Sequence, residues 1–341
     1  MSSTAKTALV ITSIAGSDHP VLQSYALACK AKGIPFYVMG DRISPADFSL
    51  DGCEFYSLER QRATGFDLVK DLPERHYGRK NIGYLLAIRE GADIILETDD
   101  DNYAHEGFWL ERKRSVEAAS LEKAGWVNVY GYFTDVRIWP RGFALEHLQD
   151  PLPSLPLKQT SSIDAPIQQG LADENPDVDA MYRLSLPLPV NFEKNASVAL
   201  GRGSWCPFNS QNTTWFKDAF PLLYLPSHCS FRMTDIWRSF VAQRIAWENG
   251  WSVWFHPPTV HQERNMHNLM RDFSDEIIGY MNNKKIASDL ESLALRSGQA
   301  SMGDNLLRCY ESLVSSKLVG EAELPLLEAW IADMRRLGIT V

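Results

Sequence analysis

The stretch Asp93-Ile94-Ile95-Leu96-Glu97-Thr98-Asp99-Asp100-Asp101-Asn102 joins a short apolar run to three consecutive carboxylates. The run 94–96 predicts a buried strand, so the acids fall where that strand leaves its sheet. Adjacent carboxylates repel one another, and a divalent cation, which prefers oxygen ligands, would offset that repulsion. In an extended chain Asp99 and Asp101 share one face while Asp100 points away. A solvated acidic loop is the alternative, but ligands of open α/β sheets bind at the carboxyl ends of strands.

Alternating strand and helix patterns precede the acidic stretch and predict an α/β fold with a mostly parallel sheet flanked by helices. The predicted elements are a strand over 7–14, a helix over 21–32, strands over 34–39 and 55–58, and a helix over 75–90. The acidic strand follows that last helix directly.

The pattern loosens after Asn102, and it becomes helical again toward the end of the chain. We expect a helix over 111–123, a strand over 126–133, an irregular excursion over 146–195, a helix over 234–249, a strand over 251–255 that ends at two prolines, and helices from about 273 with a break near 298–303. A catalytic domain over 1–265 and a C-terminal helical region over 266–341 are therefore predicted. The C-terminal helices could cover the sheet, form a homodimer contact or dock to a membrane or partner, and packing is the favoured interpretation.

Composition excludes several classes of protein. The chain has 341 residues, of which 45% are hydrophobic and 23% charged, as in ordinary globular proteins. Its formal charge of −9 disfavours a nucleic-acid binder. No apolar run approaches the roughly 20 residues of a membrane span. Five scattered cysteines without CxxC pairs indicate reduced thiols in a cytoplasmic protein.

Basic and acidic side chains mark two further places where an anionic ligand could bind. Arg79 and Lys80 lie at the start of the helix before the acidic strand, where a helix amino terminus also favours anions. A solvated basic patch explains them equally well. Asp41 and Arg42 follow the second strand, where an acid suits a base or ribose hydroxyl, although a turn aspartate is the favoured interpretation of that segment alone.

Two later segments carry residues of catalytic type. Asp235 lies at the start of a helix, so it is either a helix cap, the better interpretation of the segment alone, or a general base with a pKa near the working pH. His256 and His261 follow a late strand, and either imidazole could complete an oxygen-rich metal site, although a lone histidine is more often structural.

Taken in order, these motifs resemble the STELLO family of glycosyltransferases over residues 7–265. The motifs are Arg79-Lys80-Asn81-Ile82-Gly83-Tyr84-Leu85, Glu97-Thr98-Asp99-Asp100-Asp101-Asn102, Pro207-Phe208-Asn209-Ser210-Gln211-Asn212-Thr213, Thr234-Asp235-Ile236-Trp237-Arg238 and Pro257-Pro258-Thr259-Val260-His261. The helices beyond about residue 273 look outside this common region.

The resemblance implies a GT-A-like, Rossmann-type catalytic domain in which a D-x-D element binds a divalent metal, Mn²⁺ or Mg²⁺, and a nucleotide sugar, most readily a UDP-sugar. It implies metal binding by Asp101, Asp99 and His261, and an acceptor-side catalytic role for Asp235. It also implies that Arg79 and Asn81 face the donor, and with Asp41, Arg42, Asp99 and Asp100 they make up the predicted donor-binding residues.

We therefore expect a metal-dependent glycosyltransferase that moves a sugar to an acceptor hydroxyl in surface polysaccharide or glycan synthesis. Attack would invert the anomeric configuration if Asp235 deprotonates the acceptor, whereas a retaining or self-glycosylating route stays open otherwise. A nucleotide-sugar mutase and a non-catalytic scaffold of a polysaccharide-synthesis complex are alternatives. Plant members of the family are anchored in the Golgi membrane and this chain has no such anchor, so we expect a cytoplasmic enzyme, soluble or peripheral at the inner face of a membrane.

Overall fold

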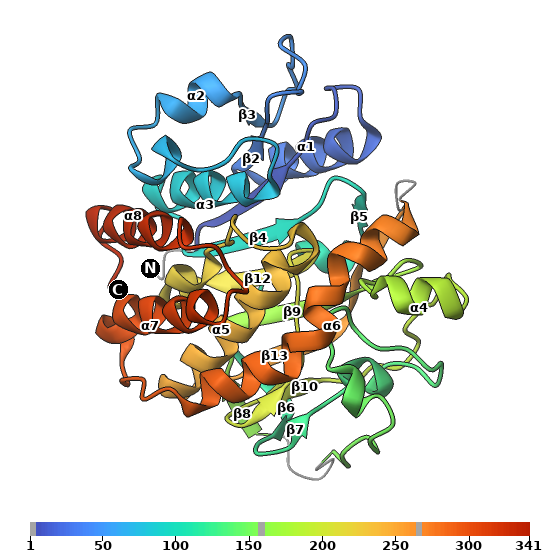
Figure 1. Ribbon diagram of the computed structural model, residues 1–341. Coiled ribbons are helices and arrows are strands. Elements are labelled where there is room, and N and C mark those ends of the chain that lie inside the picture. The colour runs from blue at the N-terminus through green and yellow to red at the C-terminus, as the bar shows by residue number, and fades with distance from the viewer. Residues whose placement is uncertain (1–4, 156–160, 264–267) are drawn as a thin grey trace.

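The computed structural model describes residues 5–155, 161–263 and 268–341, and its centre is a large mixed sheet flanked by helices (Figure 1). The strands of that sheet lie in the order β3-β2-β1-β4-β12-β9-β13-β10-β6-β8, and β5 pairs with β13. The predicted α/β class is therefore confirmed.

The first part of the chain contains the predicted strands and helices, except that the helix predicted over 75–90 begins at residue 80 and a short helix over 58–62 was not predicted. Strands β1 (Thr7–Thr12), β2 (Phe36–Met39), β3 (Glu54–Tyr56) and β4 (Ile94–Thr98) are parallel, and the connections contain helices α1 (Pro20–Lys32), α2 (Leu58–Arg62) and α3 (Lys80–Arg89). Strand β4 is buried along its whole length, which explains the apolar run over residues 94–96 with which it begins. Gly83 lets α3 approach β1 closely, because a Cβ atom there would meet a Val10 methyl group at 2.5 Å.

The second part of the sheet mixes parallel and antiparallel pairs, and several predictions fail in it. Strand β6 (Ser115–Leu121) replaces the helix predicted over 111–123, because pairing with β8 and β10 overrides the helix propensity of its alanines and glutamate. The strand predicted over 126–133 is reduced to β7 (Gly125–Trp126). The excursion over 146–195 contains β8 (Ser161–Asp164), α4 (Ala180–Ser185) and the central strand β9 (Ile167–Asp173).

The remaining strands are β5 (Asn102–Ala104), β10 (Val198–Leu200), β11 (Ser204–Trp205), β12 (Asn212–Phe216) and β13 (Val253–Gln262). Strand β13 does not end at Pro257 and Pro258 as predicted. Its register against β9 shifts between His256 and Val260, so the prolines lie where backbone N–H groups are not needed for pairing.

Helices α5 (Thr234–Glu248), α6 (Leu269–Ser292), α7 (Met302–Ser315) and α8 (Glu323–Arg336) complete the fold. Short 3₁₀ helices cover Leu68–Lys70, Tyr77–Arg79, Glu106–Trp109, Val129–Tyr132, Leu145–His147, Lys217–Leu223, Phe231–Met233 and Gln299–Ser301.

The C-terminal helices share one hydrophobic core with the sheet, which extends from Ala8 and Val10 of β1 to Trp330 of α8. The Trp330 indole N–H also donates to the Pro221 carbonyl oxygen at 3.0 Å. The predicted domain boundary at residue 265 lies outside the described residues. Within the described ranges, none of the helices combines the length and apolarity that a membrane crossing requires.

Candidate functional site

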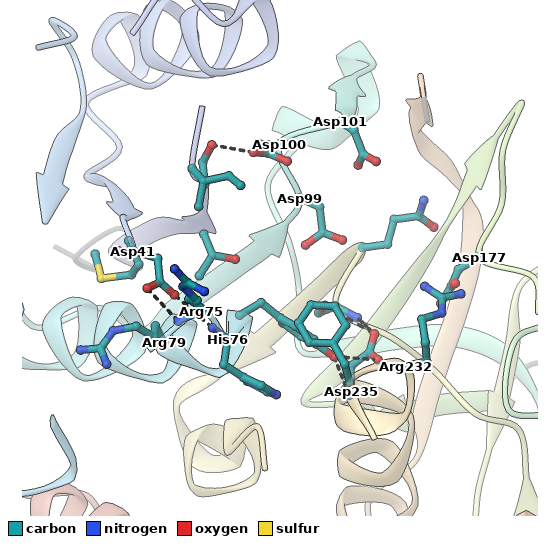
Figure 2. Close-up of a pocket in the computed structure, with 18 of the residues that line it drawn as sticks. Asp41, Arg75, His76, Arg79, Asp99, Asp100, Asp101, Asp177, Arg232 and Asp235 are labelled. Carbon is teal, nitrogen blue, oxygen red and sulfur yellow. Dashed lines mark hydrogen bonds between the residues drawn. The ribbon is translucent and has the colours of Figure 1, made fainter. Parts of the chain in front are cut away.

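A cavity of about 760 Å³ opens at the carboxyl ends of β1, β2 and β4. Its other walls come from the segment that precedes α3, the segment before β12, the start of α5 and the end of β13. Arg141, Asp177 and Arg183 complete the lining, and Figure 2 labels Asp177 among the wall residues. The same edge of the sheet is where the sequence places the acidic stretch, and it is the usual ligand-binding position of an open α/β sheet.

All three acids of the stretch line this cavity. Asp99 Oδ1 accepts from the Lys80 ammonium at 2.8 Å, Asp100 Oδ2 accepts from the Ser13 hydroxyl at 2.5 Å, and Asp101 Oδ2 accepts from the Gln262 amide at 2.9 Å. Asp100 was expected to face away, but the chain turns after β4 instead of staying extended, and Asp100 therefore also reaches the cavity.

Electrostatics separate these carboxylates from ordinary surface acids. Burial, followed by the charge of Asp99, raises the pKa of Asp101 to about 7. Burial also raises the pKa of Asp99, although the neighbouring Lys80 opposes that shift. The positive charge near these two carboxylates does not offset the free-energy cost of burying their ionised forms. A hard divalent cation, which prefers oxygen ligands, would offset that cost.

His261 does not join these acids. Its Nδ1 lies 3.1 Å from Nε2 of His105, and its ring stacks on Tyr103 at 5.2 Å between centroids. The next residue of β13, Gln262, reaches Asp101 instead, because successive side chains of a strand point to opposite faces. Among the described residues, no three or more His, Cys, Asp or Glu side chains are grouped to hold a metal ion, so the triad of Asp99, Asp101 and His261 is not assembled.

The predicted donor-binding residues outside the acidic stretch divide into two groups. Asp41 lines the cavity, and its carboxylate accepts from the backbone N–H groups of Arg75 at 2.8 Å and His76 at 3.0 Å. Arg79 also contributes to the wall, but its buried guanidinium donates to Gln61 Oε1 at 2.6 Å. Arg42 is exposed and does not line the cavity.

Asn81 is the clearest departure from the predicted donor site. It is fully buried, and its side-chain amide pairs with both backbone groups of Leu225, at 2.8 and 2.9 Å. Asn81 does not line the cavity. It therefore joins α3 to the segment after residue 223.

Asp235 lines the cavity from the first turn of α5, opposite the acids in the walls of Figure 2. Its carboxylate accepts from Arg141 Nη2 at 3.0 Å, the Tyr77 hydroxyl at 3.1 Å and the Ser210 backbone N–H at 3.1 Å. Burial alone would raise the pKa of this carboxyl, but the charge and hydrogen bond of Arg141 hold it well below its usual range. The structure thus disfavours Asp235 as a general base, which would need a pKa near neutral pH.

Three residues in or around the cavity were not among the predicted site residues. Lys80 is buried and neutralises part of the Asp99 charge; it is part of the basic segment that the sequence identifies. Arg141 and Asp177 form a two-bond pair, with both nitrogen–oxygen distances at 2.8 Å, and this pair holds Arg141 against Asp235. Arg141 and Asp177 lie in stretches without hydrophobic periodicity, so no pattern in the sequence indicated them.

Residues 232–341 match the family described as STELLO glycosyltransferases. Two curated proteins of Arabidopsis thaliana are also similar: "Probable glycosyltransferase STELLO2" is 29% identical over 94% of this chain and 44% of its own length, and "Probable glycosyltransferase STELLO1" is 29% identical over 91% and 42%. The chain thus spans less than half the length of these relatives. A crystal structure of a mycobacterial protein has a TM-score of 0.42 and 10% identity over 82% of this chain and 75% of that one.

The family match corrects one expectation, because it includes the C-terminal helices that the motif resemblance left outside the common region. The similarity to the two plant proteins extends over nearly the whole chain. These matches confirm the resemblance that the motifs predict, and the chain is similar to the STELLO glycosyltransferases.

Proposed function

We propose that this chain is a metal-dependent glycosyltransferase that takes a sugar from a nucleotide sugar, most readily a UDP-sugar, to an acceptor hydroxyl. The observation that carries the proposal is the group of three carboxylates in the cavity wall at the end of β4. The relatives named probable glycosyltransferases support the same reaction class.

The walls of the cavity suggest how a donor lies in it. Ile14 and Ile43 follow β1 and β2, line the cavity and are 52% and 60% exposed. Exposed apolar side chains in a cavity are suited to the flat face of a nucleobase. A nucleobase bound against Ile14 and Ile43 would place the diphosphate near Asp99 and Asp101 and the sugar toward Asp235.

The residues that would hold a cation are Asp101 and Asp99, and oxygens of the bound diphosphate and of water would complete the ligand set. Their oxygen chemistry and their raised pKa values fit Mn²⁺ or Mg²⁺. A divalent cation bound there supplies positive charge against the leaving nucleoside diphosphate. His261 has no place in this set, because it faces His105 on the other side of β13.

We assign Asp235 a positioning role. Its ion pair with Arg141 keeps it a weak base, while its bond to the Tyr77 hydroxyl fixes that ring beside the cavity. This arrangement orders the floor on which an acceptor would lie, and it leaves the inverting and retaining routes both open.

We further propose that the enzyme works in the cytoplasm, in surface polysaccharide or glycan synthesis. All five cysteines are free thiols, which supports a reducing compartment. A glycan or another hydroxyl compound would be the acceptor.

Thermal unfolding in the presence of nucleotide sugars tests the proposal. UDP- and GDP-sugars are each tested with and without Mn²⁺. In the presence of Mn²⁺ the preferred donor should raise the melting temperature of the wild-type protein, since a ligand at a hundredfold excess over its Kd raises the free energy of unfolding by about 2.7 kcal/mol. Asp99→Asn and Asp101→Asn should abolish the cation-dependent part of the shift. Asp51→Asn is the matched control, because Asp51 is an exposed acid outside the cavity.

The proposal is overturned if the folded wild-type protein shows no shift with any donor of the panel. Conversion of a donor without any acceptor would instead identify a mutase. Retention of cellular function in the Asp99→Asn, Asp101→Asn double variant would favour the scaffold.

A further inference from the structure

Arg75 has a strained backbone at the cavity. Four non-glycine residues of the described chain have positive φ angles, namely Arg75, Lys123, Glu174 and Lys317, and Arg75 alone among these four lines the cavity. Its φ is 56°, in the left-handed region that non-glycine residues rarely adopt. Such strain persists only where surrounding contacts enforce it, and it gathers at functional sites.

The contacts that enforce this conformation come from Asp41. Its carboxylate accepts from the backbone N–H groups of both Arg75 and His76, and its own backbone N–H donates to the Ser44 hydroxyl at 2.9 Å. Only Gly40 separates Asp41 from the end of β2, so the sheet determines the position of Asp41. The sequence assigned Asp41 to the donor, whereas the structure uses it to hold Arg75 and His76 in place.

The Arg75 side chain differs from the other arginines of the cavity wall. Arg79 donates to Gln61 and to the Leu72 carbonyl, and Arg183 donates to Asn175 and to the Pro176 carbonyl. Arg141 is paired with Asp177 and Asp235, and Arg232 is paired with Glu276. Arg75 is exposed, and within the described ranges its guanidinium has no acidic partner. In Figure 2 it lies beside Asp41 and His76, in the same cavity as the acids of the β4 tip.

We propose that Arg75 binds the diphosphate of the nucleotide-sugar donor, an inference that rests on the proposed function. A guanidinium presents two parallel N–H groups to phosphate oxygens, and such charge-assisted bonds are among the strongest in proteins. When the bond between the anomeric carbon and the diphosphate oxygen breaks, the electron pair stays on that oxygen. Arg75 stabilises the resulting charge without transferring a proton.

Isothermal titration with nucleotides tests this role. UDP and GDP, each compared with its own nucleoside in the presence of Mn²⁺, should be bound by the wild-type protein through their phosphates. Arg75→Ala should weaken the binding of the preferred nucleoside diphosphate by tenfold or more, and leave the binding of the nucleoside unchanged. Arg42→Ala is the control, because it removes the same charge from a neighbouring exposed arginine that does not line the cavity.

A second variant separates binding from folding. Arg75→Gly should melt at or above the wild-type temperature, because glycine adopts positive φ without strain, and yet lose diphosphate affinity as the alanine variant does. A side chain with a merely structural role would instead lower the melting temperature when it is removed.

Each outcome decides one of the two proposals. If the wild-type protein binds no nucleoside diphosphate, the proposed function itself fails. If it binds one and Arg75→Ala binds that ligand equally well, the assignment of Arg75 is wrong while the proposed function stands. Equal losses in Arg75→Ala and Arg42→Ala, or equal losses for nucleoside and nucleotide, would also overturn the assignment.

Discussion

Glu97 and the acids Asp99, Asp100 and Asp101 lie within five residues of one another, yet their surroundings differ completely. Glu97 is fully buried and accepts from both terminal nitrogens of Arg238, at 2.8 and 2.9 Å. It also accepts from the Trp215 indole at 2.8 Å and from the Tyr84 hydroxyl.

Asp99 and Asp100 each accept from one side chain, and Asp101 accepts from two, the amides of Gln262 and Asn102. Among the described residues, Lys80 beside Asp99 is the one cation paired with these acids. Under the proposed function, this difference separates a structural acid from a cation-binding one. A buried carboxylate with an arginine and several hydrogen-bond donors around it stabilises the sheet. A carboxylate with few such partners still has oxygen lone pairs that can bind a cation or a ligand. Four experiments can break or sharpen that comparison.

The largest effect is expected from Arg238→Ala. It leaves the Glu97 carboxylate buried without its counter-charge, which should lower the free energy of unfolding by about 3–5 kcal/mol in urea at pH 7. The double variant Arg238→Met, Glu97→Leu should recover most of that loss, because no charge then stays buried. Asp101→Asn should change stability by less than about 1 kcal/mol, and a loss as large as that of Arg238→Ala would end the comparison.

Asp235→Asn should cost about 1–3 kcal/mol at pH 7, because Arg141 keeps its pair with Asp177 but loses one charged partner. The lowered pKa of Asp235 contributes stability above its unfolded value of about 3.9, and that stability disappears as the pH falls further. The free energy of unfolding, measured by urea titration between pH 5 and pH 2, should therefore fall less steeply with decreasing pH for Asp235→Asn than for the wild-type protein. An exposed control, Asp135→Asn, should follow the wild-type curve, and an unchanged acid slope in Asp235→Asn would contradict the ion pair.

Asn81→Ala removes both hydrogen bonds to the Leu225 backbone and should cost about 1–2 kcal/mol in the same measurement. Titration with UDP should show an affinity equal to that of the wild-type protein, because Asn81 does not line the cavity. Weaker UDP binding without a change in stability would restore the donor role that the motif resemblance implies.

The smallest change in stability is expected from Asp100→Asn, at about 0.5 kcal/mol or less, since an amide oxygen can still accept from Ser13. Its effect on the Mn²⁺-dependent melting shift should lie below that of Asp101→Asn, because burial and the charge of Asp99 raise the pKa of the Asp101 carboxyl. If the two variants lose that shift equally, all three acids must be treated as one ligand set.

The sequence correctly predicted those helices and strands that have a clear local hydrophobic pattern. Strand β4 and helix α5 have unbroken apolar runs or clear periodicity, and both occur where expected. Strand β9 was missed because its buried polar residues pack through hydrogen bonds: Gln169 Oε1 accepts from the Asn209 backbone and the Thr213 hydroxyl. Those partners lie about forty residues away in the sequence, where no local pattern can indicate them.

The site was predictable to the same degree. The acids and Asp41 reach the cavity because strand ends determine their position, whereas side chains near the helix start depend on which face turns inward. Asn81 turns into the protein, and the guanidinium of Arg79 is bound to Gln61 although Arg79 contributes to the wall. Arg75, which the sequence does not distinguish from any surface arginine, lines the cavity.

Because β5 pairs with the end of β13, one backbone amide, that of Glu263, can be used to follow the opening of the acidic turn. The backbone N–H of Glu263 donates to the Asp101 carbonyl oxygen at 3.0 Å, and Gln262 pairs with Asn102 in the adjoining ladder. Opening of the acidic turn must break that bond, so exchange of the Glu263 amide with deuterated solvent measures how often the turn opens. A ligand that holds the acids in place would slow this one exchange rate before any change in global stability is visible.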